Sequence, residues 1–216
     1  MKRTLSYYEY KLLRVLGYFI RSQWYQEWLW EQRNKYDKYW YRSHFMFATI
    51  KSKQSIADVI TAYNPRSVLE IGCCVGTTLF LLQGRLTNTK FYGIDIAEDA
   101  VRFGNNHAIY NSYGNVEIIC ANGQELEMFG DKSIELVFTD ATLSNISPNG
   151  ANKIISEIKR IAQKTIIFNE WHGNQQCSKG YFVYDFSKWF NNMRYTKLDS
   201  SSGSWNKFGY LMEINL

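Results

Sequence analysis

One short stretch, Val68–Thr78, constrains the fold of this chain more than any other part of the sequence. Val68–Ile71 is a compact apolar run of the kind that forms a fully buried strand. Gly72 then lets the chain turn sharply, and Gly76 lets the backbone approach a ligand closely. The residues that follow, Thr77–Leu86, have a helical pattern, and the free N–H groups at a helix start can face an anionic or polar ligand. The stretch therefore predicts a strand–turn–helix unit that holds a ligand.

Strand and helix patterns alternate on both sides of this unit. Further strands are predicted over residues 91–94, 116–120, 134–138 and 165–168, and an antiparallel pair over 195–198 and 209–214. Helices are predicted over residues 56–62, 98–110 and 148–162, the last with Ser147 as N-cap and Pro148 at its first position. The alternation predicts an α/β fold, a Rossmann-like doubly wound sheet that is mostly parallel with an antiparallel terminal strand. Ligands of such sheets bind beyond the carboxyl ends of the strands.

The first 50 residues differ in composition from the rest of the chain. They hold 9 of the 25 Lys and Arg residues but only 4 of the 20 acids, and 15 of the 36 aromatic residues. Tyr7–Tyr41 contains no proline and is predicted to be helical, with one apolar stripe repeating every four residues: Leu12, Leu16, Ile20, Trp24 and Trp28. We expect residues 1–50 to form an N-terminal helical cap and residues 51–216 to form the ligand-binding domain.

Three interpretations of this aromatic, basic segment stay open. It can be a cap that packs on the main domain and walls the acceptor pocket, which is the interpretation we favour. It can instead lie on an anionic membrane surface, or it can contact RNA through stacked aromatic side chains. Acidic residues among the basic ones weaken the last two interpretations, because they offset attraction to phosphate.

Length and cysteine usage limit the other possibilities. A chain of 216 residues corresponds to one domain with an added segment and can bury a large core without disulfides or metals. Its 4 cysteines include no CxxC pair, so neither a zinc ribbon nor a redox motif is predicted. Val15–Ile20, the longest early apolar run, is too short for a membrane span or a secretory signal. We therefore expect a cytoplasmic protein.

The spacing of the glycines separates two kinds of nucleotide-binding loop. A dinucleotide fingerprint requires glycine at the positions of Cys74 and Thr77, and a phosphate-binding loop requires a Gly-Lys-Ser/Thr sequence that is absent. The stretch Glu70-x-Gly72-x-x-x-Gly76 instead resembles motif I of the class I S-adenosylmethionine (SAM)-dependent methyltransferases, with Cys74 in place of the middle glycine. A small side chain fits there if the local φ is negative.

The resemblance extends over residues 55–216 and implies SAM as cofactor. Phe91–Ile96 is similar to the second-strand motif of the family, in which the acid, here Asp95, binds both ribose hydroxyls. Asn122 stands where the family usually has an aspartate near the adenine amino group. The cofactor-binding residues implied in this way are Glu70, Gly72, Cys73, Cys74, Gly76, Asp95, Ile96, Asn122 and Gly123. Two alternatives stay open: Asp95 as a helix N-cap and Asn122 as a turn residue before Gly123.

Methyl transfer depends mainly on aligning the acceptor with the methyl group, and a base is required only when the acceptor must lose a proton. His172, after the fifth predicted strand, is the best candidate base among three histidines. Asp140, at the end of the fourth strand, is the second catalytic candidate and can also contact the methionine part of SAM. Tyr41, His44 and Trp171 are expected to bind the substrate. A metal site formed by Asp140, Asn169 and Glu170 would carry an amide ligand and a displaced one, so no metal is expected.

The sequence thus predicts a SAM-dependent methyltransferase that acts on a small molecule, at oxygen in preference to nitrogen. The fourth strand is followed by Thr139–Thr142 and lacks the Asn/Asp-Pro-Pro-aromatic signature of nucleobase methylases, so nucleic acid is not the expected partner. Two alternatives remain: an RNA or protein methyltransferase that docks its substrate on residues 1–50, and an inactive SAM-fold protein that binds or regulates a partner. The strand-end sequences look most like methylases of sugar and polysaccharide pathways.

Overall fold

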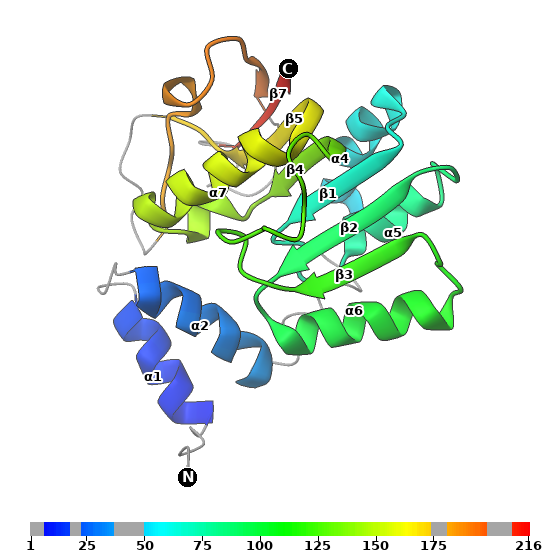
Figure 1. Cartoon of the computed structure of the whole chain (residues 1–216). Helices are drawn as coiled ribbons and strands as arrows, with labels where there is room; N and C mark the ends of the chain where they lie inside the picture. Colours follow the sequence, from blue (N-terminus) through cyan, green and yellow to red (C-terminus); the bar gives the residue numbers. More distant parts are fainter. Residues whose placement is uncertain (1–6, 18–22, 37–49, 174–180, 198–208) are drawn as a thin grey trace.

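The computed structural model describes residues 7–17, 23–36, 50–173, 181–197 and 209–216. Seven strands form one sheet in the order β3-β2-β1-β4-β5-β7-β6 (Figure 1). The strands are β1 (Ser67–Ile71), β2 (Lys90–Asp95), β3 (Val116–Cys120), β4 (Ile134–Asp140), β5 (Ala162–Trp171), β6 (Arg194–Lys197) and β7 (Gly209–Asn215). Neighbours are parallel from β3 to β5, whereas β7 runs antiparallel to both β5 and β6. The predicted Rossmann-like sheet with an antiparallel terminal strand is confirmed.

Helices cover both faces of this sheet. The helices are α1 (Tyr7–Gly17), α2 (Gln23–Tyr36), α4 (Ile50–Tyr63), α5 (Thr77–Gln83), α6 (Glu98–Tyr110) and α7 (Pro148–Ile161), with short 3-10 turns η2 (Leu143–Asn145) and η3 (Phe186–Lys188). Apolar residues of α4, α5 and α6 pack with one face of the central strands, and those of α7 pack with the other (Figure 1). We call these the α4 face and the α7 face. The two cores make the central strands buried on both sides, as their continuous apolar runs predict.

Local signals place most of the element ends correctly. Helix α7 begins as predicted, because the Ser147 side chain accepts a hydrogen bond from Gly150 N at 3.4 Å and Pro148 stands at the first position. Helix α6 and strand β3 have the predicted bounds. Helix α5 ends three residues earlier than predicted, at Gln83, because Gly84 follows as its C-cap. Helix α4 is longer than the predicted 56–62 segment and begins at Ile50.

The prediction of one long N-terminal helix is wrong. Helix α1 ends at Gly17, a residue that favours helix ends, and α2 begins at Gln23. The two helices pack through a small hydrophobic cluster of Tyr10, Tyr25 and Leu29, and the Tyr25 hydroxyl donates to Leu13 O at 2.7 Å. The predicted stripe is not a buried face, since Leu12 and Leu16 remain 63% and 42% exposed. The predicted stripe assumed one straight helix. Its members Leu12 and Trp28 belong to two different helices, so the spacing of four residues does not define one face.

Figure 1 shows where these two helices lie. Helix α2 packs between α1 and α6, so that α1 is the outer helix of the pair. The pair lies near the end of β3, and the Gln124 side chain after β3 donates a hydrogen bond to the Glu27 carboxylate of α2. The predicted cap therefore reaches one edge of the sheet's carboxyl end.

Candidate active site

The turn after β1 has the left-handed backbone that its glycines predict. Gly72 and Gly76 both have φ +78°, a region in which a side chain is strained. The turn is fixed to β2 because Gly72 N and Cys73 N both donate to Ile94 O, at 2.7 and 3.0 Å. Space reinforces the requirement for glycine: a Cβ on Gly72 would collide with Thr142, and one on Gly76 with the Ile118 side chain. At Gly76 the need for glycine therefore comes from packing against Ile118 of β3 as well as from the expected close approach of a ligand.

Cys74 adopts a backbone that differs from the sequence-based expectation. Its φ is +54°, so the condition of a negative φ for a side chain at this position is not met. A left-handed residue with a Cβ costs about 1–2 kcal/mol. Burial, together with the nearby Asp95 charge, raises the pKa of the Cys74 thiol well above its usual range. Its backbone N–H donates to Asp95 Oδ2 at 2.7 Å, and this bond joins the turn to the end of β2.

Asp95 faces the turn from the last position of β2. Its second oxygen accepts a hydrogen bond from Ala97 N at 2.9 Å, so the carboxylate bridges the turn and the entry to α6. Burial raises the pKa of Asp95, and these two backbone bonds work in the opposite direction. The helix-cap alternative is partly met, because the bond to Ala97 lies at the helix start, although the N-cap residue of α6 is Ala97 itself. Ile96 follows, half-buried beside it.

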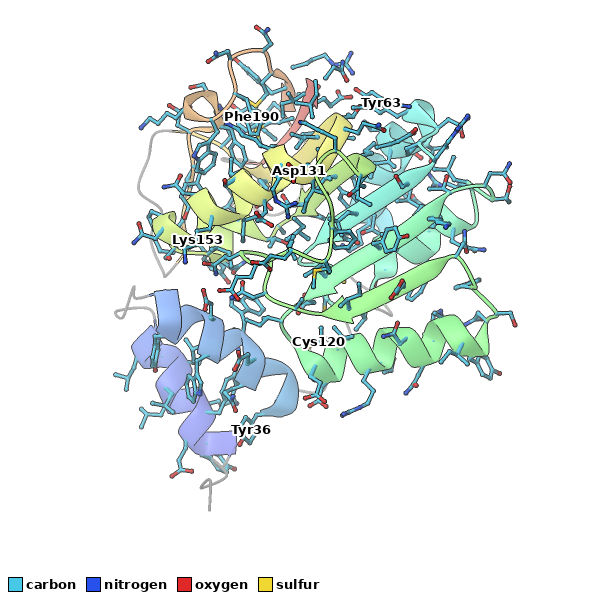
Figure 2. The ribbon with its side chains drawn as sticks, viewed as in Figure 1. Tyr36, Tyr63, Cys120, Asp131, Lys153 and Phe190 are labelled. Carbon is cyan, nitrogen blue, oxygen red and sulfur yellow. The ribbon has the colours of Figure 1, made fainter. Side chains whose placement is uncertain are left out.

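After β3, Asn122 and Gly123 form the next turn of the carboxyl edge. The Asn122 side-chain oxygen accepts from Gln124 N at 3.1 Å, which is the turn role left open by the sequence. Gly123 lies against Ile71 so closely that a Cβ there would come within 2.8 Å of Ile71 Cγ2. The turns after β1, β2 and β3 are therefore neighbours at one edge of the sheet, and Cys120, labelled in Figure 2, marks the end of β3.

A charged cluster that sequence reasoning missed lies under the β1 turn. Lys53 of α4 extends to the sheet, and its Nζ donates to Asp140 Oδ2 at 2.7 Å and to Thr78 Oγ1 at 3.0 Å. The same Nζ lies 4.0 Å from Glu70 Oε1. Glu70 is 0% exposed, and within the described part of the chain neither of its carboxylate oxygens has a hydrogen-bond partner. A buried acceptor without a donor is uncommon and marks a position where a ligand donor would be stabilised.

The pKa values of this cluster follow from its burial. Burial raises the pKa of Glu70 to about 8, although the charge of Lys53 opposes that rise. For Lys53, burial lowers the pKa, but the charges of Asp140 and Glu70 outweigh it and raise the pKa above its usual range. Lys53 therefore stays protonated at neutral pH, beside an acid, Glu70, whose pKa is raised to about 8.

Asp140, the second catalytic candidate, is fully engaged in this cluster. Asn169 of β5 donates to Asp140 Oδ1 at 2.7 Å, while Lys53 binds the other oxygen. Glu170, the next residue along β5, points to the α7 face and accepts bonds there from Thr139 of β4 and from the segment after β4. The three residues weighed as metal ligands thus do not converge. Within the described ranges, no group of three His, Cys, Asp or Glu side chains is arranged to hold a metal ion.

Trp171 is the last residue of β5, and His172 follows it. The Nδ1 atom of His172 accepts from Phe186 N at 3.3 Å, and its ring lies 5.7 Å from the Tyr195 ring and 5.3 Å from the Tyr210 ring. Trp171 is buried and contacts Tyr181 with ring centroids 5.3 Å apart. Because side chains alternate along a strand, His172 lies on the α7 face and Asp140 on the α4 face. The two catalytic candidates are not brought together. Tyr41 and His44 lie outside the described residues.

Comparison with known proteins agrees with this geometry. The profile of a family described as "Methyltransferase domain" matches residues 65–214. A search of curated protein sequences found no match. Among the residues that the structure describes, no helix has the length and apolarity needed to cross a membrane.

Solved structures share the fold at low sequence identity. A SAM-dependent methyltransferase from Aquifex aeolicus superposes with a TM-score of 0.60 at 16% identity, covering 82% of this chain and 97% of that one. Magnesium protoporphyrin IX methyltransferase from Synechocystis PCC 6803, with bound SAM, has a TM-score of 0.66 at 15% identity and covers 88% and 96%. Geranyl diphosphate C-methyltransferase from Streptomyces coelicolor A3(2) has a TM-score of 0.60 at 11% identity and covers 76% and 78%. By its matched domain and its sheet, the chain belongs to the SAM-dependent methyltransferases.

Proposed function

We propose that this enzyme transfers the methyl group of SAM to an oxygen atom of a small-molecule acceptor. The observation that carries the proposal is the pair of polar clusters at the carboxyl edge, one at Asp95 and one at Lys53, on either side of the β1 turn. SAM supplies an electrophilic methyl group on a sulfonium. The protein's own residues would bind SAM and the acceptor, orient them for the transfer and exclude water from the site.

For the adenosine end we assign the turns after β1, β2 and β3. The Asp95 carboxylate would accept from the ribose hydroxyls, since each oxygen keeps a lone pair beyond its one backbone bond. Gly72, Cys73, Cys74 and Gly76 would form the wall beside it. Ile96 would contact the adenine, and Asn122 with Gly123 would line its far edge.

For the methionine end we assign the Lys53 cluster. An amino acid group carries an ammonium and a carboxylate, and the cluster offers carboxyl oxygens for the first and a cation for the second. The Glu70 oxygens, which have no hydrogen-bond partner among the described residues, suit the ammonium, whose charge would favour the Glu70 anion. Asp140 lies beside them, and Lys53 suits the carboxylate. The donor set therefore fits the cofactor, and Asp140 acts in this proposal as a binding residue.

On the acceptor side we assign His172 as the base and Trp171, Tyr41 and His44 as substrate-binding residues. An alcohol or phenol must lose a proton as it is methylated, and a neutral imidazole can take it up. Since Phe186 N donates to Nδ1, the other ring nitrogen carries the proton of the neutral ring, so Nε2 would act as the base only after the tautomer changes and the bond from Phe186 N breaks. Among the structural neighbours, one acts on a porphyrin and one on geranyl diphosphate, which supports a small acceptor.

The N-terminal helices support two further proposals. As a cap, α2 would close the adenine edge through Glu27 and Gln124. The outer side of α1 exposes a continuous apolar stripe beside Lys11, consisting of Tyr8, Leu12, Val15 and Leu16. With the basic excess of residues 1–50, this stripe would suit contact with an anionic membrane surface.

Titration with S-adenosylhomocysteine (SAH) and a methyl-transfer assay test the assignments separately. Asp95→Ala should weaken SAH binding by about 1–3 kcal/mol, whereas Asp99→Ala, in the first turn of α6, should leave it unchanged. His172→Gln should lower kcat on an alcohol or phenol acceptor without changing SAH affinity. Wild-type affinity in Asp95→Ala would remove that residue from the site. Unchanged kcat in His172→Gln would remove the base.

A further inference from the structure

Glu170 is a second deeply buried acid at the carboxyl edge, and the mechanism above does not use it. It is 1% exposed, and among the described residues it forms no ion pair. Its Oε1 accepts three hydrogen bonds, from Thr139 Oγ1 at 2.8 Å, Thr142 N at 2.7 Å and Leu143 N at 3.0 Å. Its Oε2 accepts a weaker one from Ser144 N at 3.4 Å. This carboxylate is thus stabilised by the Thr139 hydroxyl of β4 and by three N–H groups of the segment that follows.

That segment, residues 141–146, begins with an unfavourable backbone. Ala141 has φ +55°, a left-handed conformation that costs a residue with a Cβ about 1–2 kcal/mol. Only an outside contact keeps such a turn in place. Ala141 N donates to Asn169 O at 2.9 Å, and the Glu170 side chain binds the next amides. The end of β5 therefore holds the turn that follows β4.

The same segment touches the β1 turn through one side chain. Thr142 Oγ1 lies 3.2 Å from Ile71 O and 3.5 Å from Gly72 O. It occupies the space into which a Cβ on Gly72 would project. Glu170 holds the backbone N–H of Thr142, and the Thr142 hydroxyl, which also lies 3.3 Å from Asp140 O, can donate its one proton to Ile71 O, the nearest of the three carbonyls. A contact path of two residues thus leads from β5 to the turn assigned to the cofactor.

We propose that Glu170 is a positioning residue of the cofactor site, which acts through Thr142 to hold the β1 turn in its binding shape. This inference rests on the proposed function, since the turn must be the one that binds SAM. Hydrogen bonds to a carboxylate are roughly twice as strong as neutral ones. Glutamine at this position would keep the shape of the side chain and one acceptor oxygen. It would lose the negative charge, and its NH₂ group would face the N–H of Ser144, which is also a donor.

Isothermal titration with SAH at pH 8 tests this inference with four variants. Burial raises the pKa of Glu170 to about 7 against the bonds that favour its anion, so at pH 8 the carboxylate is ionised. Glu170→Gln and Thr142→Val should each weaken binding about tenfold. The double variant should be no weaker than either single one, because both remove the same constraint. Thr142→Ser, which keeps the hydroxyl, should bind like the wild type.

Glu213→Gln is the matched control. Glu213 is a buried acid of β7 that accepts from Tyr63 and Arg194, and Tyr63 lies across the sheet from the N-terminal helices (Figure 2). The Glu213→Gln variant should bind SAH like the wild type even if it unfolds more readily. Wild-type affinity in Glu170→Gln, additive losses in the double variant, or an equal loss in Glu213→Gln would each overturn the inference.

Two further outcomes separate failure of this inference from failure of a variant to fold and from failure of the proposed function. If Glu170→Gln does not fold, undiminished binding by Thr142→Val would overturn the inference, and weaker binding with full rescue by Thr142→Ser would support it. If the wild-type chain does not bind SAH, the proposed function itself fails.

Discussion

Replacing Lys53 by methionine tests the buried cluster most severely. Methionine keeps most of the apolar stem of lysine and removes only the ammonium group. The change leaves Asp140 without its cation while its side chain is 9% exposed and that of Lys53 14%. It also removes the bond to Thr78 at 3.0 Å.

The expected loss of stability follows from this burial. Breaking a buried pair by removing one partner costs about 3–5 kcal/mol, because the remaining charge stays buried. Glu70 adds little to that penalty at pH 7, since its pKa of about 8 lets it keep a proton. We therefore expect Lys53→Met to lower the free energy of unfolding by about 3 kcal/mol. Lys53→Met combined with Asp140→Asn should recover about 2 kcal/mol of this loss, because no charge is then stranded.

Urea unfolding at pH 7, followed by circular dichroism, measures both effects. Arg85→Met is the control, since Arg85 binds Asp58 at 2.6 Å but on the surface, where such pairs contribute less than about 1 kcal/mol. If the Lys53 and Asp140 losses simply add within about 0.5 kcal/mol, the two residues do not interact as described. A loss for Lys53→Met as small as that of Arg85→Met would contradict the reasoning in the same way.

Three other changes follow from the same contacts. The folded-state pKa of Glu70, about 8, lies above its ordinary value of 4.5, so its contribution to stability is lost as pH rises between these values. Denaturant melts should accordingly show a steeper fall from pH 5 to pH 8 for the wild type than for Glu70→Gln, and parallel curves would refute this. Cys74→Gly should raise stability by about 1 kcal/mol, because glycine adopts φ +54° without strain; a loss of that size would speak against the left-handed turn. In flotation assays with anionic vesicles, Leu12→Asp with Val15→Asp should abolish binding while the exposed Met128→Asp retains it, and equal flotation of all three proteins would exclude the α1 stripe.

Local patterns in the sequence predicted the frame of the fold. The buried run before Gly72 and the capping pair Ser147 and Pro148 depend on neighbours along the chain, so they could be predicted from residue order alone. Strands β4 and β5 proved longer than their apolar runs. Polar residues such as Asp140 and Asn169 continue the ladder, because they pair with each other across the sheet.

The features that were missed depend on distant partners. Lys53 meets Asp140 across 87 residues of chain, and nothing in its own surroundings distinguishes it from other lysines of the segment. From the sequence, Glu170 was considered only as a metal ligand. Its positioning role could not be predicted, because its partners Thr142 and Leu143 come from the turn after another strand. The N-terminal stripe failed because its period assumed one helix, whereas Gly17 ends the first.

The central claim is that the turn from Gly72 to Gly76 binds the adenosyl cofactor. Isothermal titration of the intact wild-type chain with SAH, NAD⁺ and ATP in parallel tests it most directly. We expect saturable binding of SAH at sub-millimolar concentration and no measurable heat from the other two. Binding of NAD⁺ or ATP without binding of SAH would contradict the assignment.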